Sequence, residues 1–281
     1  MEINELQRMA TQVRRDIIRM VSKPASGHPG GALGCADFMT ALYFEVMQDI
    51  DPKHFTIDGK GEDVFFLSIG HLSAVWYSVL ARRGYFDTKE LDTFRLINSR
   101  LQGHPTCAEG LPGVRVSSGS LGQGLSVACG AALSKKLNHD DHLVFTLQGD
   151  GELEEGQIWE AAMFAAARGI DNLIATVDYN GKQIDGSVDA VLSLGNLRTK
   201  WEAFGWRVLE TNGNNMTELL ETLRQARQLT GKGQPIVILM RTEMGMGVDF
   251  MMGTNKWHGK APNAEQTAAA LSQLPETVGD F

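Results

Sequence analysis

Cysteine is scarce in this chain of 281 residues, which has only Cys35, Cys107 and Cys129. An odd number without metal-ligand spacing argues against a disulfide framework and predicts reduced thiols. Long hydrophobic runs are lacking too, since no stretch approaches the roughly 20 apolar residues that cross a bilayer. The N-terminus does not have the charged and then apolar order of a signal peptide. We therefore expect a cytoplasmic protein that does not act at a membrane.

Basic residues are in the minority: 26 lysines and arginines face 34 aspartates and glutamates, which gives a formal net charge of -8. Short basic doublets such as Arg14-Arg15 and Arg82-Arg83 interrupt this balance, but nucleic acid is not an expected partner. The hydrophobic content of 43% suffices for one large α/β domain or two small ones. Because no charge block or low-complexity run marks a boundary, we treat residues 1–281 as a single domain.

Apolar runs and helical patterns alternate along the chain. Strands are expected at 64–68, 143–147, 173–177, 207–209 and 235–240. Helices are expected at 4–22, 33–47, 87–98, 125–137, 192–204, 216–229 and 264–273, with further helical patterns after His71 and from 152 to 167. The alternation predicts an α/β fold with a doubly wound, mainly parallel sheet and helices on both faces. The segment 23–31 contains two prolines and three glycines, which predict an irregular loop.

Two of the expected strands end in oxygen-bearing side chains. Gly149-Asp150-Gly151 follows the strand at 143–147, and Asp178-Tyr179-Asn180 follows the strand at 173–177. Ligands of open α/β sheets bind beyond the carboxyl ends of strands, so Asp150 and Asn180 could hold one cation that bridges to a phosphate. The glycines would let backbone amides approach that anion closely. A tight strand-to-helix turn without a ligand is the competing interpretation.

Glu152, Glu154 and Glu155 crowd the turn after Gly151. Acidic side chains favour a helix N-terminus electrostatically, and this is the default explanation for them. Three carboxylates beside Asp150 nevertheless exceed that need.

Four histidines each adjoin a glycine in an irregular loop, namely His28, His71, His104 and His258. Two of these loops follow expected strands on the side where Asp150 lies, so we expect the four to converge. Neutral imidazoles donate hydrogen bonds to phosphate and carbonyl oxygens and relay protons near neutral pH. A zinc site is the competing idea, but no His-x-x-x-His or cysteine-rich spacing supports it. The other three histidines are interpreted as surface residues (His54, His139, His142).

The order and spacing of these motifs resemble the transketolase family over most of the chain. The matching segments are Ser26-Gly-His-Pro-Gly30, Gly70-His71, Gly103-His104-Pro105, Gly119-x-Leu-Gly-Gln-Gly124, Gly149-Asp-Gly to Asn180, and His258-Gly259. The resemblance implies the thiamine diphosphate-binding fold, and in particular its diphosphate-binding domain. Departures from the family pattern are Ser120, where proline is frequent, and Tyr179, where a second asparagine is frequent.

The resemblance also implies a role for each matching residue. Mg²⁺, or alternatively Ca²⁺ or Mn²⁺, would be bound by Asp150, Asn180 and the backbone carbonyl of Lys182. The cofactor thiamine diphosphate would meet the Gly151 amide, His71 and His258, and its rings would lie against Gly119, Leu121 and Ile184. His28, His104 and His258 would face the sugar, and Glu155 would join a carboxylate network at a subunit interface.

The implied reaction is that of the pentose phosphate pathway, in which a two-carbon ketol unit passes from a ketose phosphate to an aldose phosphate. Transketolases carry a further domain with a glutamate that activates the cofactor ring, and nothing after His258 matches it. Residues 260–281 are expected to hold one short helix, 264–273, and an exposed tail. The chain is therefore expected to be the N-terminal subunit of a split transketolase, active only with a separate C-terminal subunit. The expected assembly is an α2β2 complex or a homodimer of this chain.

Three alternatives stay open. The family that makes 1-deoxyxylulose 5-phosphate shares the Gly-His and Gly-Asp-Gly loops, although Pro29 and the Gln-Gly-His-Pro loop favour transketolase. The α subunit of a 2-oxoacid dehydrogenase would leave the four histidine loops unexplained. A non-catalytic regulatory subunit that keeps half of a cofactor site is the third.

Overall fold

The computed structural model describes residues 1–281, and its centre is a five-stranded sheet in the order β1-β2-β3-β7-β6. The strands span Val64–Leu67 (β1), Val144–Gly149 (β2), Leu173–Tyr179 (β3), Ile236–Arg241 (β7) and Arg207–Asn212 (β6). Every neighbouring pair is parallel, which confirms the expected fold class. Four of these strands are almost wholly buried, which is why they read as continuous apolar runs in the sequence.

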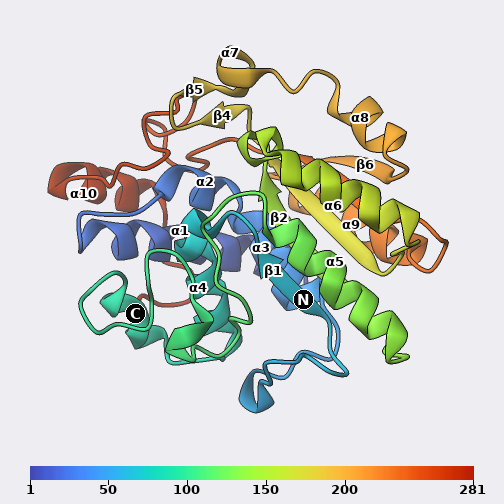
Figure 1. Cartoon of the computed structure of the whole chain (residues 1–281). Coiled ribbons are helices and arrows are strands. Elements are labelled where there is room, and N and C mark those ends of the chain that lie inside the picture. Colours follow the sequence, from blue (N-terminus) through green and yellow to red (C-terminus); the bar gives the residue numbers. More distant parts are fainter.

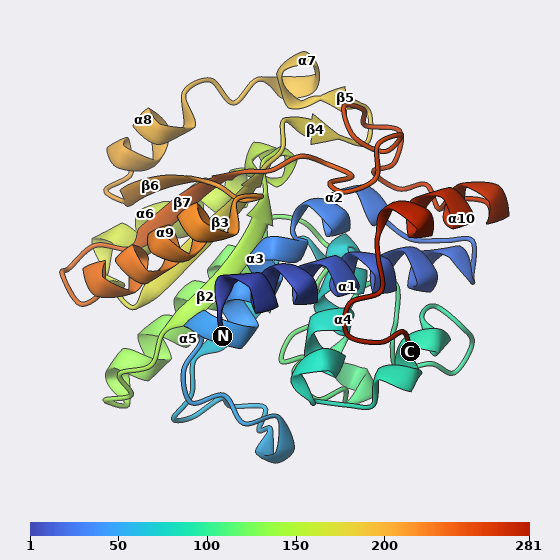
Figure 2. The same cartoon turned by 180° about the vertical axis from the view of Figure 1, so that it is seen from behind.

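Helices cover both faces of this sheet (Figures 1 and 2). One face carries α1 (Ile3–Ser22), α3 (Ala36–Ala41), α4 (Ser73–Arg83) and α9 (Met216–Leu229), which enclose the larger core. The other carries α5 (Gly124–Leu137), α6 (Gly156–Ala167) and α8 (Leu197–Ala203). Alternation along β2 feeds both cores, since Phe145 joins the first and Val144 the second. None of the helices has both the length and the apolar character that spanning a bilayer requires.

The segment around His28 is more regular than expected. Helix α2 (Pro29–Gly34) begins at the second proline of the segment 23–31, so irregular structure ends at His28. Proline suits the first position of a helix, because its missing N–H would have no partner there. The expected helix at 33–47 is therefore three consecutive pieces, namely α2, α3 and a π-helical turn at Leu42–Val46.

Two other expected helices are shorter than the sequence pattern suggested. Asp87 caps a 3-10 helix, but that helix covers only Thr88–Thr93, and Arg95 then adopts a left-handed backbone with φ of 58°. The expected helix at 192–204 is α7 (Val188–Leu192) followed by α8, because Gly195 with φ of 61° breaks it. Further short 3-10 turns lie at Pro52–His54, Gly70–Leu72, Cys107–Glu109 and Gly151–Glu154. A small antiparallel hairpin, β4 (Lys182–Gln183) and β5 (Gly186–Ser187), was not predicted.

The C-terminal segment contains the expected helix, α10 (Ala264–Gln273), which begins in a capping box at Asn263. The tail after Leu274 is exposed along much of its length, as expected, but it is also docked on the rest of the chain. Leu274 is buried, and Asp280 accepts hydrogen bonds from Arg15 and Arg19 of α1. Figure 2 shows this last stretch of chain running beside α1 to the C-terminus. Ion pairing to a basic helix face thus fixes the tail.

Candidate active site

The first component of the site lies where β2 and β3 end side by side. Gly149 pairs with Asp178 in the sheet, so Asp150 and Asn180 leave neighbouring strands at the same edge. The Asp150 side chain is buried, and its carboxylate accepts hydrogen bonds of 2.8 Å from the amide of Gly151 and 2.5 Å from the amide of Gly181. The structure therefore brings the Asp150 and Asn180 turns together, as the sequence predicted.

Asp178 is a part of this site that sequence reasoning had not assigned a role. Its buried carboxylate accepts a 2.8 Å hydrogen bond from the Asn180 side-chain amide and another from the hydroxyl of Thr242. It thereby fixes which way the Asn180 amide faces. The oxygen of that amide accepts a 2.8 Å bond from the backbone N–H of Lys182. A charged residue directly after the apolar run 173–177, two positions before Asn180, was the signal that could have identified it.

The electrostatics of these two carboxylates fit a bound cation. Burial raises the pKa of Asp150 to about 7, and the negative charge of Asp178 adds to the rise. Burial also raises the pKa of Asp178. No group of three or more His, Cys, Asp or Glu side chains is arranged as a metal site. A hard cation here would thus combine Asp150 with neutral oxygens, which Mg²⁺ and Ca²⁺ accept.

The second component is the histidine cluster. The ring of His28 lies 5.1 Å from that of His71, 6.0 Å from that of His104 and 5.9 Å from that of His258, measured between ring centroids. His71 and His258 are 5.1 Å apart. The four rings converge as expected, although they come from loops distant in the sequence.

Burial keeps these imidazoles neutral near pH 7. It lowers the pKa of His28 to about 4 and that of His71 to about 3, with the neighbouring histidines contributing to both. The pKa of His104 and that of His258 are lowered for the same primary reason. The Nδ1 atoms of His28 and His258 are buried and have no hydrogen-bond partner. Such orphaned polar atoms are expected where a ligand supplies the partner.

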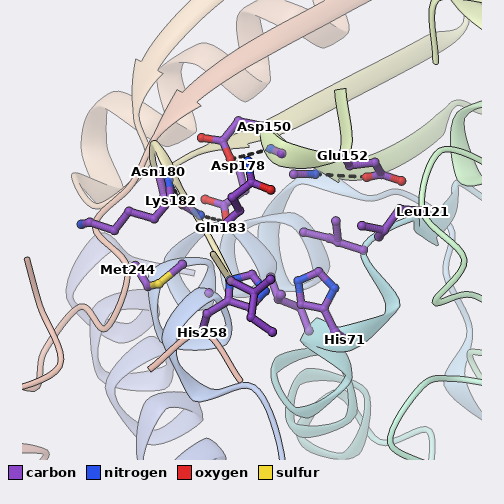
Figure 3. A pocket seen from close by; sticks show the side chains of 16 residues that line it. His71, Leu121, Asp150, Glu152, Asp178, Asn180, Lys182, Gln183, Met244 and His258 are labelled. Atoms are coloured by element: carbon purple, nitrogen blue, oxygen red, sulfur yellow. Dashed lines mark hydrogen bonds between the residues drawn. The ribbon is translucent and has the colours of Figure 1, made fainter. Parts of the chain in front are cut away.

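One pocket joins the two components (Figure 3). Asp150 and Asn180 lie on one side of it, and His71 and His258 on the other. Its lining also includes Leu121, Gly151 and Ile184, which were expected at the cofactor, and Lys182, which was expected at the metal, but not Gly119. His28 and His104 are not among the residues that line it; the ring of His28 lies near those of the lining residues His71 and His258, and His104 lies near His28. Gly119 packs on His104, because a Cβ there would lie 2.9 Å from the His104 ring.

Two of the three glutamates after Gly151, Glu152 and Glu155, differ in their surroundings. Glu152 is buried, and its carboxylate accepts hydrogen bonds from the Ser68 hydroxyl, the Gly122 amide at 2.8 Å and the Gly149 amide at 3.1 Å. It joins the ends of β1 and β2 to the loop before α5, so helix-dipole complementation is the wrong explanation for it. Glu155 is exposed beside Gly122.

A diphosphate-sized anion with a cation would suit the glycine-flanked end of β2, and neutral imidazoles would suit a polyhydroxylated carbonyl compound. The fold and the pocket together define a cofactor-binding α/β domain of the doubly wound class. The family model described as "Transketolase, thiamine diphosphate binding domain" matches residues 6–276. The chain belongs to the transketolase family and carries its thiamine diphosphate-binding domain.

Several relatives of similar length are named as transketolase subunits. The chain is 37% identical to one subunit of the apulose-4-phosphate transketolase of Phocaeicola vulgatus, covering 99% of this chain and 96% of that one. It is 39% identical to the SqwG subunit of the 6-deoxy-6-sulfo-D-fructose transketolase of a Clostridium species, covering 96% of each chain.

Solved transketolase structures confirm the fold. The transketolase of Campylobacter jejuni superposes with a TM-score of 0.89 at 32% identity, covering 98% of this chain and 43% of that one. The enzyme of Leishmania mexicana gives a TM-score of 0.88 at 30% identity. The chain thus spans somewhat under half the length of these solved transketolases.

Proposed function

We propose that the chain is the N-terminal subunit of a two-subunit transketolase, which transfers a two-carbon ketol unit between ketose and aldose phosphates. The names of the relatives of equal length, as subunits of transketolases, support this division of labour. The observation that carries the proposal is the pocket in which the Asp150 and Asn180 turns face His71 and His258, whose neutral rings belong to a cluster with His28 and His104. The partner would be a separate C-terminal subunit that supplies the pyrimidine-binding domain, in an α2β2 assembly located in the cytoplasm.

We assign the cation site to Asp150, Asn180 and the backbone carbonyl of Lys182, with Mg²⁺ as its occupant and Ca²⁺ or Mn²⁺ as substitutes. Buried Asp150 provides the charge, and Asp178 orients Asn180. The Gly151 amide would meet the diphosphate. Leu121 and Ile184 would line the cofactor rings with Gly119. When bound, thiamine diphosphate supplies the nucleophilic thiazolium carbon on which ketol transfer depends.

The histidines of the chain would handle the sugar. His104 orients donor hydroxyls, while His28 and His258 hold or pass protons at the carbonyl oxygens. His71 and His258 reach toward the diphosphate. A neutral imidazole can donate through one nitrogen and accept through the other, which suits both tasks. The low pKa values of His28 and His71 keep that form populated at pH 7.

The test is reconstitution. The purified chain is assayed with thiamine diphosphate and Mg²⁺ on a ketose phosphate donor and an aldose phosphate acceptor, alone and with the candidate C-terminal subunit. We expect ketol transfer only from the pair, because the glutamate that activates the cofactor ring would come from the partner. Full turnover by the lone chain refutes the division of labour. Pyruvate consumption by the pair would instead indicate the 1-deoxyxylulose-5-phosphate synthase reaction.

A further inference from the structure

Arg95 connects two of the histidine loops. Its Nη1 donates a 2.9 Å hydrogen bond to the Ser26 hydroxyl, and its Nη2 donates a 3.3 Å bond to the Gly103 carbonyl. Ser26 lies two residues before His28, and Gly103 lies immediately before His104. The Gly103 carbonyl also accepts a 2.8 Å bond from the hydroxyl of Ser73. One guanidinium thus bridges loops that are otherwise far apart in the sequence.

The local backbone is adapted to this placement. Arg95 has φ of 58°, a left-handed conformation that costs a non-glycine residue of order 1 kcal/mol or more and is held only where the surroundings require it. Its own amide is tied to the Leu101 carbonyl at 2.9 Å. A Cβ on Gly103 would lie 2.6 Å from Arg95 Cζ, so the glycine makes room for the guanidinium. Both features indicate that the position of this side chain matters.

The charge of Arg95 acts on two of the four histidines. Burial is the largest cause that lowers the pKa of His28 and that of His104, and the positive charge of Arg95 lowers both further. The pKa of His71 is lowered by burial and by the other histidines, and the pKa of His258 is lowered by burial alone. The groups facing His28 are therefore Arg95, His71, His104 and His258.

We propose that Arg95 is a positioning residue, which holds the His28 and His104 loops at the spacing at which both imidazoles meet one ligand. Its Nη1 and Nη2 each donate to one of the two loops, so these contacts act on the histidines through the backbone and Ser26, while its buried Nε has no partner within the protein. That the ligand is a sugar rests on the proposed function, whereas the bridge itself does not.

Histidine titrations by NMR test the bridge on the full chain without a partner. In Arg95→Gln the pKa values of His28 and His104 should rise, while those of His71 and His258, on which the arginine charge does not act directly, should shift less. Arg168→Gln, at an exposed arginine without an ion pair, is the matched control and should move none of them. Equal shifts in all four histidines, or no shift in any, would overturn the proposal.

A second variant covers the possibility that Arg95→Gln does not fold. Gly103→Ala keeps the arginine in the chain but places a Cβ against its guanidinium, and it should reproduce the rise at His28 and His104. Unchanged titrations in a folded Gly103→Ala chain also contradict the bridge.

In the reconstituted pair, Arg95→Lys keeps the charge but not the planar two-point contact. We expect kcat/KM for the donor sugar to fall on the order of ten- to hundredfold, since small misplacements of catalytic groups cost this much. The affinity for thiamine diphosphate, measured by calorimetry, should stay the same. If both quantities fall together, Arg95 supports the whole fold and not the histidines. If no pair has activity, the proposed function fails while the titrations still decide the bridge.

Discussion

The Asp150 carboxylate accepts a hydrogen bond of 2.5 Å from the amide of Gly181, which ties the end of β2 to the turn after β3. Because the sheet pairs Gly149 with Asp178, this contact follows from strand register and needs no long-range loop to form it. A buried carboxylate held by backbone amides has little freedom to move. The chain therefore holds one fixed pair of carboxyl oxygens beside the glycine-flanked turn, and a bound cation would favour their charged form.

Asp150→Ala should abolish cofactor capture. Removing an outer-shell partner of a metal ligand typically costs about 10- to 100-fold in metal affinity, and loss of the ligand itself should exceed that. We expect calorimetry with thiamine diphosphate and Mg²⁺ to show at least about a hundredfold weaker binding. Asp141→Ala, at an exposed aspartate, is the control. If Asp150→Ala still supports full activity of its partner, the regulatory-subunit interpretation is correct.

Asp178→Asn should weaken cation binding without removing a ligand. The Asp178 carboxylate orients the Asn180 amide through a 2.8 Å bond, and an amide in its place could present N–H where an acceptor is needed. We expect a loss of about 10- to 100-fold in Mn²⁺ affinity, measured by electron paramagnetic resonance. The far-ultraviolet circular dichroism should not change. Wild-type affinity in this variant would mean that Asn180 needs no orienting partner.

The proximity of Asp150 and Asn180 could be predicted, because it depends on the order and register of the strands. The apolar runs of the sequence indicate where those strands lie. Helix α9 (Met216–Leu229) and helix α10 (Ala264–Gln273) likewise have the predicted bounds, because periodicity and capping residues are local signals. The histidine cluster was predictable only as a convergence, from the repeated Gly-His setting. Its distances and protonation state depend on burial, which the sequence does not display.

Other features depend on contacts that no local pattern encodes. The tail docks through Asp280, which pairs with Arg15 from the opposite end of the chain. Glu152 lies in a short 3-10 turn without periodicity, so its burial had no signal beyond the excess of carboxylates. The helix expected at 87–98 fails because Arg95 is left-handed, a conformation that tertiary contacts impose on a residue with ordinary helix propensity.

Asp140→Asn should lower stability in a pH-dependent way. Partial burial acts to raise the pKa of Asp140, but hydrogen bonds from Lys135 at 2.8 Å, Gly61 and His142 outweigh it and hold the pKa below its usual range. Because the folded pKa is the lower one, the stabilisation is present above the unfolded value near 3.8 and disappears as the pH falls toward the folded value.

The variant should therefore lose about 1–3 kcal/mol of unfolding free energy at neutral pH, since Lys135 stays buried without its charged partner. Urea titrations at pH 7 and at about pH 3 check this, and the difference from wild type should shrink at the lower pH. Asp141→Asn, at the exposed neighbour, should change little at either pH. A difference that grows on acidification would have the wrong sign for this account.

Glu152→Ala should destabilise the chain. The substitution leaves the Ser68 hydroxyl and the amides of Gly122 and Gly149 without their buried acceptor. Unsatisfied buried donors cost about 1–3 kcal/mol each, and partial relaxation should reduce the sum to roughly 2–5 kcal/mol. Urea unfolding measures the loss, with Glu160→Ala at an exposed position of α6 as the control. Equal stability of the two variants would mean that water replaces the carboxylate.

Glu155→Gln should instead damage activity and leave stability alone. The Glu155 side chain is exposed in the lone chain, next to Gly122 in the loop before α5, so its carboxylate is free to meet another subunit. We propose that this carboxylate joins a carboxylate network at the interface with the partner subunit. Removing its charge should then lower the activity of the reconstituted pair, while unfolding of the lone chain should shift by less than about 0.5 kcal/mol. Glu152 is not a fair comparison, because its replacement acts on folding, so Glu160→Gln is the matched control. If Glu155→Gln and Glu160→Gln both leave the activity of the pair almost unchanged, Glu155 only complements the helix dipole. Exposed charges near a helix N-terminus contribute only about 0.3–1 kcal/mol to stability.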